Sequence, residues 1–461
     1  MARIIVQNDL FVNFWKQIEN TPDLERIAAV LKWLPDEKFI RKLEKVSKNG
    51  RKDYSVRYKW NLLVTMVLIG ARTMADFHRE LKRNPTLVKI CGGMPKVVWY
   101  DAVPSLSSLY RFKDTVKEHI GDLKEIINEM LEEIQKELPD LGENIAVDST
   151  ILHSRSSQLA SNKEMKESKV EKRDERREND AKWGKKRYYS EDNKLLKVVT
   201  FLGFKLHVIV DAKYEIPLAI IVTPGNVNDV TQLLPLMEEL KQNNPELLKR
   251  VKYLVADRGY DSRENNRELV NRYRVIPLIE SRRLWKEKEP RALRTDRVDN
   301  IMYDEHGNLY CVDPITEKIR QMAPMGYEKK REALKYRCPA AAYGLECIGK
   351  KACMQNYKGK SSFGRVVRVP IKTDERVFTP VLRDSKKWER IYKGRTSVER
   401  FNARMKNILN LDSRNFRNLP NMELKAVLSI LAMIGMFLAR LKYKDMEHLR
   451  SFYAPLEQKA A

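Results

Sequence analysis

Short apolar runs alternate with segments of helical periodicity between residues 144 and 279, and this alternation limits the possible folds more than any other feature of the chain. The runs in "NIAVDST", "LGFKLHVIVD", "IPLAIIVTPG" and "RVKYLVADRGYD" are typical of strands, and only "AKYE" separates the second from the third, as in a hairpin. Helical segments such as "VTQLLPLMEELKQ" lie between the later runs. Strands with intervening helices predict an α/β sheet flanked by helices.

The segments on either side of the sheet region are predicted to be helical. Residues 1–140 carry apolar side chains at helical spacing and are interpreted as a helical DNA-binding domain, with a helical packing module as the alternative. A final helical pair is expected at about 420–450. Its apolar stretch, 426–439, has 14 residues, fewer than the roughly 20 that span a bilayer, and therefore predicts a buried helix.

Two segments interrupt the sheet region. Residues 155–190 are polar and of mixed charge, which indicates an exposed helix or a mobile loop. Residues 280–385 lack long periodicity and hold four of the five cysteines, so we interpret them as an inserted subdomain. The predicted division is a helical N-terminal domain at 1–140, the first part of an α/β core at 141–279, the insertion at 280–385, and the end of the core with C-terminal helices at 386–461.

The chain carries 88 lysines and arginines against 63 aspartates and glutamates, a formal net charge of +25. Such an excess favours nucleic acid as partner, because neutralising phosphates releases counterions and gives salt-sensitive affinity. A lysine-rich thermophilic surface usually brings matching glutamates, and no amphipathic anchor supports membrane binding. The start "MARIIVQNDLFVNFW" is unlike a signal peptide, and five cysteines in 461 residues do not form a disulfide scaffold. We therefore expect a cytoplasmic, reduced protein.

Two aspartates follow apolar strand runs. Asp148 comes after "IAV" and Asp257 after "LVA". Ligands gather outside the carboxyl ends of strands in open α/β sheets, so adjacent strands would bring both acids to one edge. The alternative for each is an aspartate that caps the following turn.

A third carboxylate lies in "YKGRTSVERFNARMK". On one continuous helix, at about 100° per residue, Tyr392, Arg395, Glu399 and Lys406 share an arc of roughly 60°. The apolar side chains lie opposite: Val398, Phe401, Met405, Ile408 and Leu409. The polar row suits phosphate binding, whereas a surface salt bridge is the plain alternative for Glu399. Three carboxylates are what a pair of Mg²⁺ ions needs for in-line phosphoryl displacement.

These motifs resemble those of a known family. The spacing Y-(2)-R-(3)-E-(6)-K in "YKGRTSVERFNARMK", preceded by "AVDST" and "VADRGYD" in that order, is similar to the DDE transposases of bacterial insertion sequences that carry this signature. The stretches "GFKLHVIVD" and "TPGNVNDVTQLLPLMEEL" resemble the region between the two aspartates, and "PSLSSLYRF" resembles the helical domain before the core. The resemblance covers most of residues 55–440.

The resemblance implies an RNase H-like core, a mixed five-stranded sheet flanked by helices, interrupted by a β-rich insertion. It implies Asp148, Asp257 and Glu399 as ligands of two Mg²⁺ ions, for which Mn²⁺ can substitute. Arg395 and Lys406 would hold phosphates, with Tyr392 assisting. The implied activity is nicking of double-stranded DNA at the element ends and transfer of the 3′-hydroxyl into target DNA by a homodimer. An RNase H-like nuclease without strand transfer and an inactive DNA-binding protein are the alternatives.

Two features of the insertion remain open. Some relatives stack a flipped base on a tryptophan, a role that Trp285 could fill, and a core or surface tryptophan is the alternative. The cysteines Cys311, Cys338, Cys347 and Cys353 end in a C-x8-C-x5-C spacing rather than the C-x2-C of a strong zinc motif. They are either ligands of a structural Zn²⁺ or ordinary cysteines.

Overall fold

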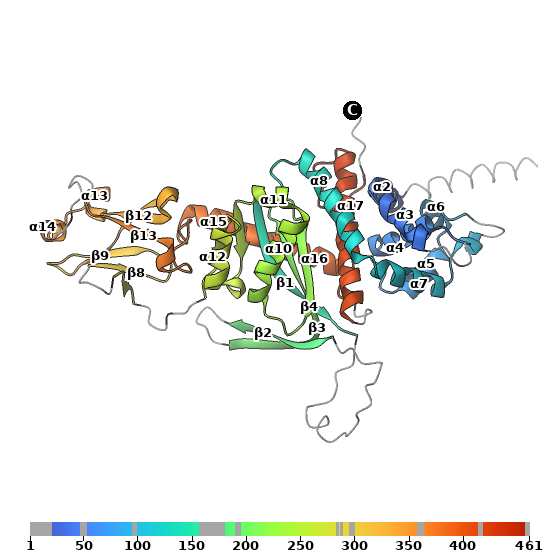
Figure 1. Cartoon of the computed structure of the whole chain (residues 1–461), viewed down its shortest axis with the longest axis horizontal. Helices are drawn as coiled ribbons and strands as arrows, with labels where there is room; N and C mark the ends of the chain where they lie inside the picture. Colours follow the sequence, from blue (N-terminus) through green and yellow to red (C-terminus); the bar gives the residue numbers. More distant parts are fainter. Residues whose placement is uncertain are drawn as a thin grey trace, which may run out of the picture.

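The computed structural model describes residues 21–46, 53–94, 99–155, 180–189, 195–282, 285, 289–294, 300–355, 357, 364–413 and 418–456. Helices occupy the N-terminal part as predicted, and Figure 1 shows them at one end of the molecule: α2 (Pro22–Trp33), α3 (Glu37–Val46), α4 (Val56–Leu68), α5 (Met74–Leu81), α6 (Pro85–Ile90), the 3₁₀ turn η1 (Trp99–Ala102), α7 (Leu106–Lys117) and α8 (Ile120–Glu137). Ser55, Thr73 and Ser105 cap α4, α5 and α7 by accepting a backbone N–H.

A mixed sheet forms the centre of the molecule. Its strands are β1 (Asn144–His153), β2 (Lys182–Tyr189), β3 (Leu195–Asp211), β4 (Pro217–Pro224), β5 (Tyr253–Ala256) and β6 (Ile276–Ile279). The order is β2-β3-β1-β5-β6, and β4 also pairs with β3. Strand β1 is antiparallel to β3 and parallel to β5. The predicted hairpin across "AKYE" is confirmed, since β3 and β4 pair antiparallel on either side of it.

The sheet has six strands, so the expected number of five is wrong. The sixth is β2, which lies in the segment predicted to be an exposed helix or mobile loop. Half of its residues are charged, but the extended start of β3 offers an open row of backbone groups, and β2 pairs antiparallel with it (Figure 1). The rest of that segment, residues 156–179, lies outside the described residues.

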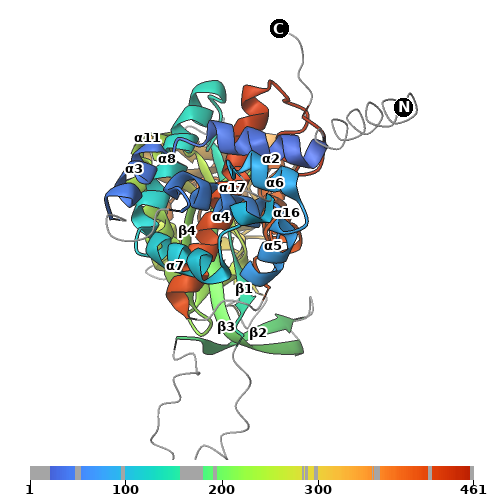
Figure 2. The same cartoon turned by 90° about the vertical axis from the view of Figure 1, so that its right-hand side faces the viewer.

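Helix α17 (Leu419–Lys442) organises the core. It packs against α2, α4, α8 and β4, and Figure 2 shows the N-terminal helices gathered around it. By length and composition α17 could span a membrane, yet its apolar window is wholly buried within the protein, which confirms the predicted buried helix. Buried side chains of the N-terminal helices, the sheet and α17 form one continuous cluster.

The predicted final helical pair is wrong, because the described chain has only α17 in this region. After Lys442 the chain turns through Lys444, whose φ is +58°. It then runs back across the end of α17, where the fully buried Arg440 donates to the carbonyl of Ser451 at 2.8 Å. The guanidinium also binds Asp445. The need to satisfy this buried charge holds the segment as turns instead of a second helix.

The sheet is flanked by further helices. They are η2 (Asp229–Gln232), α10 (Leu233–Asn243), α11 (Pro245–Arg250), η3 (Arg258–Tyr260), α12 (Arg263–Asn271), α15 (Lys386–Tyr392), η7 (Lys393–Arg395) and α16 (Thr396–Asn407).

Two small antiparallel sheets lie between β6 and α15, at the opposite end of the molecule from the N-terminal helices (Figure 1). One contains β7 (Arg291–Ala292), β8 (Ile301–Tyr303), β9 (Leu309–Val312) and β10 (Ile319–Gln321). The other contains β11 (Ala323–Glu328), β12 (Ala333–Arg337) and β13 (Val366–Pro370). The short helices are η4 (Lys329–Arg331), α13 (Pro339–Tyr343), α14 (Lys350–Met354) and η6 (Ile371–Thr373). This region has a small apolar core of its own.

Candidate active site

Asp148 and Asp257 lie side by side because of strand register. The parallel pairing of β1 with β5 ends at the partners Val147 and Ala256, and each aspartate is the next residue along the chain. Asp257 follows the end of β5 as predicted, and its Oδ1 accepts the N–H of Gly259 at 2.8 Å. Asp148 is not at a strand end, contrary to expectation. Strand β1 continues beyond it because its other neighbour, β3, goes on pairing with it as far as His153.

The two carboxylates are held in an environment that opposes their charge. Burial and then the neighbouring Asp257 raise the pKa of Asp148 to about 7. Burial also raises the pKa of Asp257, an effect that the Gly259 N–H opposes and Asp229 reinforces. Asp229 begins η2 and acts in the same direction on Asp148. Three acids therefore stand close together, and the site favours a proton or a cation among them.

Glu399 does not join this pair in the structure. Its side chain is 50% exposed and forms an ion pair with Arg395, with Nη1 and Oε1 2.8 Å apart. In the described part of the chain, no three His, Cys, Asp or Glu side chains are placed to hold a metal ion. Arg395 stands between the two groups. Burial opposes its charge, but Glu399, Tyr392 and Asp148 outweigh burial and raise the pKa of its guanidinium.

The helix that carries Glu399 differs from the predicted one. The sequence predicts a single helix from Tyr392 to Lys406, but the 3₁₀ turn η7 around Gly394 separates α15 from α16. Tyr392 and Arg395 still lie near each other, since each affects the pKa of the other. Within α16 the predicted division of faces is confirmed, because Val398, Phe401 and Met405 are buried and the helix packs on β1 and β3.

Basic side chains surround the acids. Lys186 on β2 partly offsets the rise in the pKa of both Asp148 and Asp257. Lys406 is largely buried, and burial lowers its pKa, with Asp412 acting in the opposite direction. The ring of Tyr392 stacks on Trp388 with centroids 6.1 Å apart, and its hydroxyl donates to Glu280 Oε2 at 3.3 Å. Arg395, Lys406 and Lys186 thus place three cations next to the aspartate pair.

The part of the chain that carries these acids matches a known protein family. The family model described as "Transposase DDE domain" matches residues 141–434, which is more than half of the chain. The chain belongs to the DDE transposase family. The matched span includes Asp148, Asp257 and Glu399.

A relative and a solved structure also match this DDE transposase. "Putative transposase for insertion sequence element IS402" of Burkholderia cepacia is 44% identical over 86 residues, which is 18% of this chain and 39% of that protein. The chain thus matches about two fifths of that relative's length. The cryo-EM structure of the piggyBac transposase synaptic complex with hairpin DNA matches with 13% identity and a TM-score of 0.36, over 94% of this chain and 75% of that chain. A score this low establishes no common fold.

Three residues of the site in this DDE transposase were missed from sequence. Asp229 lies in "GNVNDV" and forms an ion pair with Lys205 at 2.9 Å. Tyr260 is fully buried beside Asp148, Asp229 and Asp257, which add to burial in raising its pKa. Lys186 lies on the unforeseen strand β2. The "VND" aspartate after a strand run was a usable signal for Asp229, whereas pairing across β3 alone brings Lys186 to the site.

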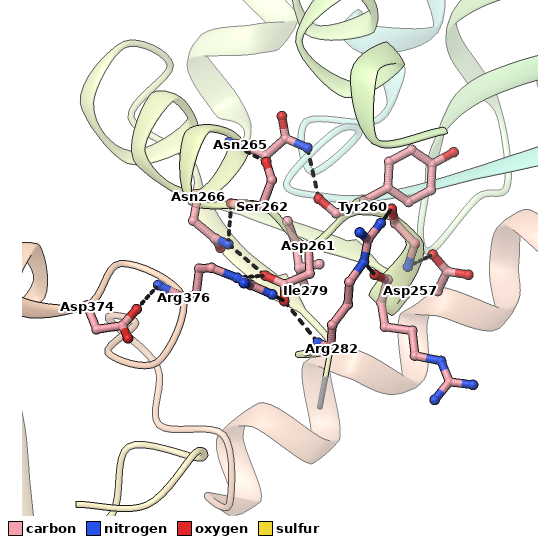
Figure 3. A network of polar contacts seen from close by, with 12 residues as sticks. Asp257, Tyr260, Asp261, Ser262, Asn265, Asn266, Ile279, Arg282, Asp374 and Arg376 are labelled. Atoms are coloured by element: carbon pink, nitrogen blue, oxygen red, sulfur yellow. Dashed lines mark hydrogen bonds and ion pairs between the residues drawn. The ribbon is translucent and has the colours of Figure 1, made fainter. Parts of the chain in front are cut away.

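A buried network fixes the turn that follows Asp257, and Figure 3 shows it. The carboxylate of Asp261 has no exposed surface and binds the Arg376 guanidinium. It also accepts the N–H of Arg282 at 2.9 Å and the Asn266 amide at 3.2 Å. The Arg282 side chain donates in turn to the carbonyl of Arg258 at 2.8 Å. The first and last parts of the insertion are thereby attached to the turn that carries Asp257.

The remaining predicted residues lie away from the aspartate pair. Trp285 packs on the small core of the insertion, edge-on to Tyr303 at 5.4 Å, and the Arg291 guanidinium lies 4.1 Å from its ring centroid. This packing favours the alternative of a core tryptophan. The four cysteines of the insertion line a common pocket among β9, α13 and α14, at the end of the molecule in Figure 1.

The raised pKa of Asp148 predicts a pH-dependent stability of the metal-free protein. Its folded pKa of about 7 lies above the usual value near 3.9 in an unfolded chain, so the folded state binds the proton more tightly. The stabilisation is fully present below about pH 4 and is lost as the pH rises through about 7. We expect Asp148→Asn to flatten the fall in thermal midpoint over this range. Parallel curves for parent and variant in chelator would contradict the assignment.

Proposed function

We propose that this protein is a DNA transposase, which cleaves DNA at the ends of an insertion sequence and transfers the ends to target DNA. The observation that carries the proposal is the register of β1 and β5, which leaves Asp148 and Asp257 adjacent and partly buried. Such a pair has little use in folding, because each charge opposes the other. In a chain of the DDE family, these residues correspond to the acids expected at a phosphoryl-transfer centre.

The sheet supports an RNase H-like core as the finer description of the fold. Strands β4, β3, β1, β5 and β6 form a mixed five-stranded set, in which β1 is antiparallel to one neighbour and parallel to the other. The central β1 carries the first aspartate, and α16 with Glu399 packs on β1 and β3. The strand β2 is then an addition at the edge of this core.

The donor set fits a hard divalent cation, which we take to be Mg²⁺ with Mn²⁺ as a substitute. Asp148, Asp257 and Glu399 would hold it, since carboxylate oxygens are the ligands that Mg²⁺ prefers. When bound, the ions supply activation of the attacking oxygen and stabilisation of the leaving one. Glu399 would exchange its partner Arg395 for this role. The fit rests on the two adjacent, partly buried aspartates, whose mutual repulsion a cation relieves.

The chain's own cations then bind the DNA backbone. Once released from Glu399, the Arg395 guanidinium can donate two N–H bonds to a phosphate beside the acids. Lys406 and Lys186 act as further phosphate contacts, which position the strand without reading sequence. Tyr392 is fixed by Trp388 and Glu280 and orients the segment that leads into Arg395.

The proposed transposase function also leads to proposals for the partners of the protein and its location. A net charge of +25 suits double-stranded DNA of the element ends and of the target, with the N-terminal helices at 1–140 contributing to binding. Two DNA ends require two active sites, so a homodimer on DNA is proposed, in the cytoplasm. A zinc ion on the cysteines of the insertion has no part in this reaction and is inferred separately.

A strand-transfer assay tests the proposal. Purified full-length protein is incubated with a labelled duplex that carries the inverted repeat flanking its reading frame, with supercoiled target plasmid and Mg²⁺. We expect nicking at the repeat, joining to plasmid, and loss of both in chelator. Nicking without joining would favour the nuclease without strand transfer. Binding without metal-dependent nicking would favour the inactive DNA-binding protein.

A further inference from the structure

Four cysteines of the insertion come together from separate elements. Cys311 lies on β9, Cys338 is the N-cap of α13, Cys347 precedes α14 and Cys353 lies within α14. All four line one pocket, and all are free thiols. The fifth cysteine, Cys91, is buried among the N-terminal helices. Four cysteines that are spread over more than forty positions of sequence therefore line the same pocket.

The thiols are electrostatic neighbours of one another. Burial raises the pKa of Cys311 to about 11, and Cys338, Cys353 and Cys347 each add to the shift. A carboxylate and an amide lie beside them: the Cys347 thiol donates to Asp313 Oδ2 at 3.5 Å, and the Asn300 amide lies 3.9 Å from the sulfur of Cys353. Arg320 also lines the pocket, so a positive side chain is at hand if thiolates form.

Residues 338–355, which carry three of these cysteines, bury few apolar side chains that could stabilise their fold. Helices α13 and α14 have five residues each, too short to be stable alone. Helix α14 buries no residue, and α13 buries only Pro339 and Ala340. The apolar side chains Tyr343 and Ile348 are 62% and 65% exposed. No residue between 338 and 355 belongs to the small core of the insertion. The cysteine pocket is the feature that joins residues 338–355 to β9.

We propose that Cys311, Cys338, Cys347 and Cys353 bind one structural Zn²⁺ ion as four thiolates. Four sulfur ligands in a closed site select a tetrahedral metal, of which zinc is the common structural choice. Binding releases one proton from each thiol, and no electron is transferred. The bound ion would close the loop that joins α13 to α14 onto β9, and it replaces the missing apolar core. Small domains generally need such a staple.

The contacts around the pocket are compatible with this ligand set. Asp313 loses the Cys347 donor when that thiol ionises, but it keeps the N–H groups of Ile315 at 3.0 Å and Gly349 at 3.2 Å. Asn300 can donate to a thiolate sulfur, and Arg320 offsets part of the double negative charge of a zinc tetrathiolate. The side chains as placed form no metal-holding group among the described residues, so binding includes an inward movement of the sulfurs.

Metal analysis of the full-length protein tests the proposal. Protein purified under reducing conditions is expected to hold about one zinc per chain after dialysis. Cys338→Ser and Cys353→Ser should each lower the zinc content at least about tenfold, because one ligand of a closed site is lost. Cys91→Ser, a buried cysteine outside the pocket, should leave it unchanged. Limited proteolysis should cut the parent near residues 338–365 only after chelator treatment.

A second readout avoids dependence on the folding of any variant. Parent protein stripped of metal and given Co²⁺ should show the visible absorption of tetrahedral cobalt thiolate, and Zn²⁺ should displace it. If the parent protein holds no metal as purified under reducing conditions, and all four thiols of the insertion react freely, the proposal is wrong. Iron in place of zinc, or disulfides between these cysteines in the native protein, would overturn it as well. None of these outcomes depends on transposase activity.

Discussion

Replacing Glu399 by glutamine is expected to lower Mg²⁺-dependent nicking of an end-containing duplex by roughly a thousandfold or more, because a ligand of a cooperating set is lost. DNA affinity should be retained. The amide keeps the shape of the side chain, and the packing of α16 rests on its opposite face, where Val398 and Phe401 are buried. Loss of the exposed Arg395–Glu399 pair should cost only about 0.3–0.5 kcal/mol of stability.

The chain offers a matched control in the preceding helix. Glu389 also pairs with a cation four residues away, Lys393, at 3.1 Å, and its side chain is 69% exposed. Glu389→Gln removes the same charge from the same type of pair, so it should leave nicking unchanged. Nicking would be measured beside gel-shift affinity for both variants. If Glu399→Gln cleaves within about tenfold of the parent, as Glu389→Gln should, Glu399 is a surface ion-pair residue and its assignment to the metal is wrong.

The second large effect is expected at the junction between the core and the insertion. Arg376→Gln leaves the carboxylate of Asp261 buried without its ionic partner, which should destabilise the fold by about 3 kcal/mol. The side chain of Asp261 has no exposed surface. Nicking should fall as well, because Asp261 and Arg282 hold the turn that carries Asp257 (Figure 3). Thermal unfolding and nicking of the purified variant are the measurements.

Another arginine in the insertion serves as the control for this variant. Arg368 binds Glu328 at 2.8 Å with both side chains partly exposed, so Arg368→Gln should change stability by at most about 1 kcal/mol. Combining Arg376→Gln with Asp261→Asn should recover part of the loss, since the unpaired buried charge is then gone. Equal, small effects of the two arginine variants would show that the Asp261 network contributes little to stability.

The sequence by itself determined which residues form the framework of this protein. The alternating apolar runs specified β1, β3, β4 and β5, because strands buried on both faces must be apolar. Apolar spacing also predicted the helical N-terminal part, the buried α17 and the apolar face of α16. The order and spacing of Asp148, Asp257 and Glu399 also pointed to the DDE family, since the acids of the site belong to local motifs that can be recognised without a fold.

Tertiary structure decided the rest, because the remaining features depend on contacts between distant segments. Pairing with β3 turned the charged segment of β2 into a strand and brought Lys186 to the acids. The buried Arg440 held the chain after α17 in turns. A 3₁₀ turn at Gly394 interrupts the expected helix, and Glu399 pairs with Arg395 instead of joining the aspartates. The convergence of four cysteines is of the same kind, since their sequence spacing gives no distance in space until β9, α13 and α14 are placed around one pocket.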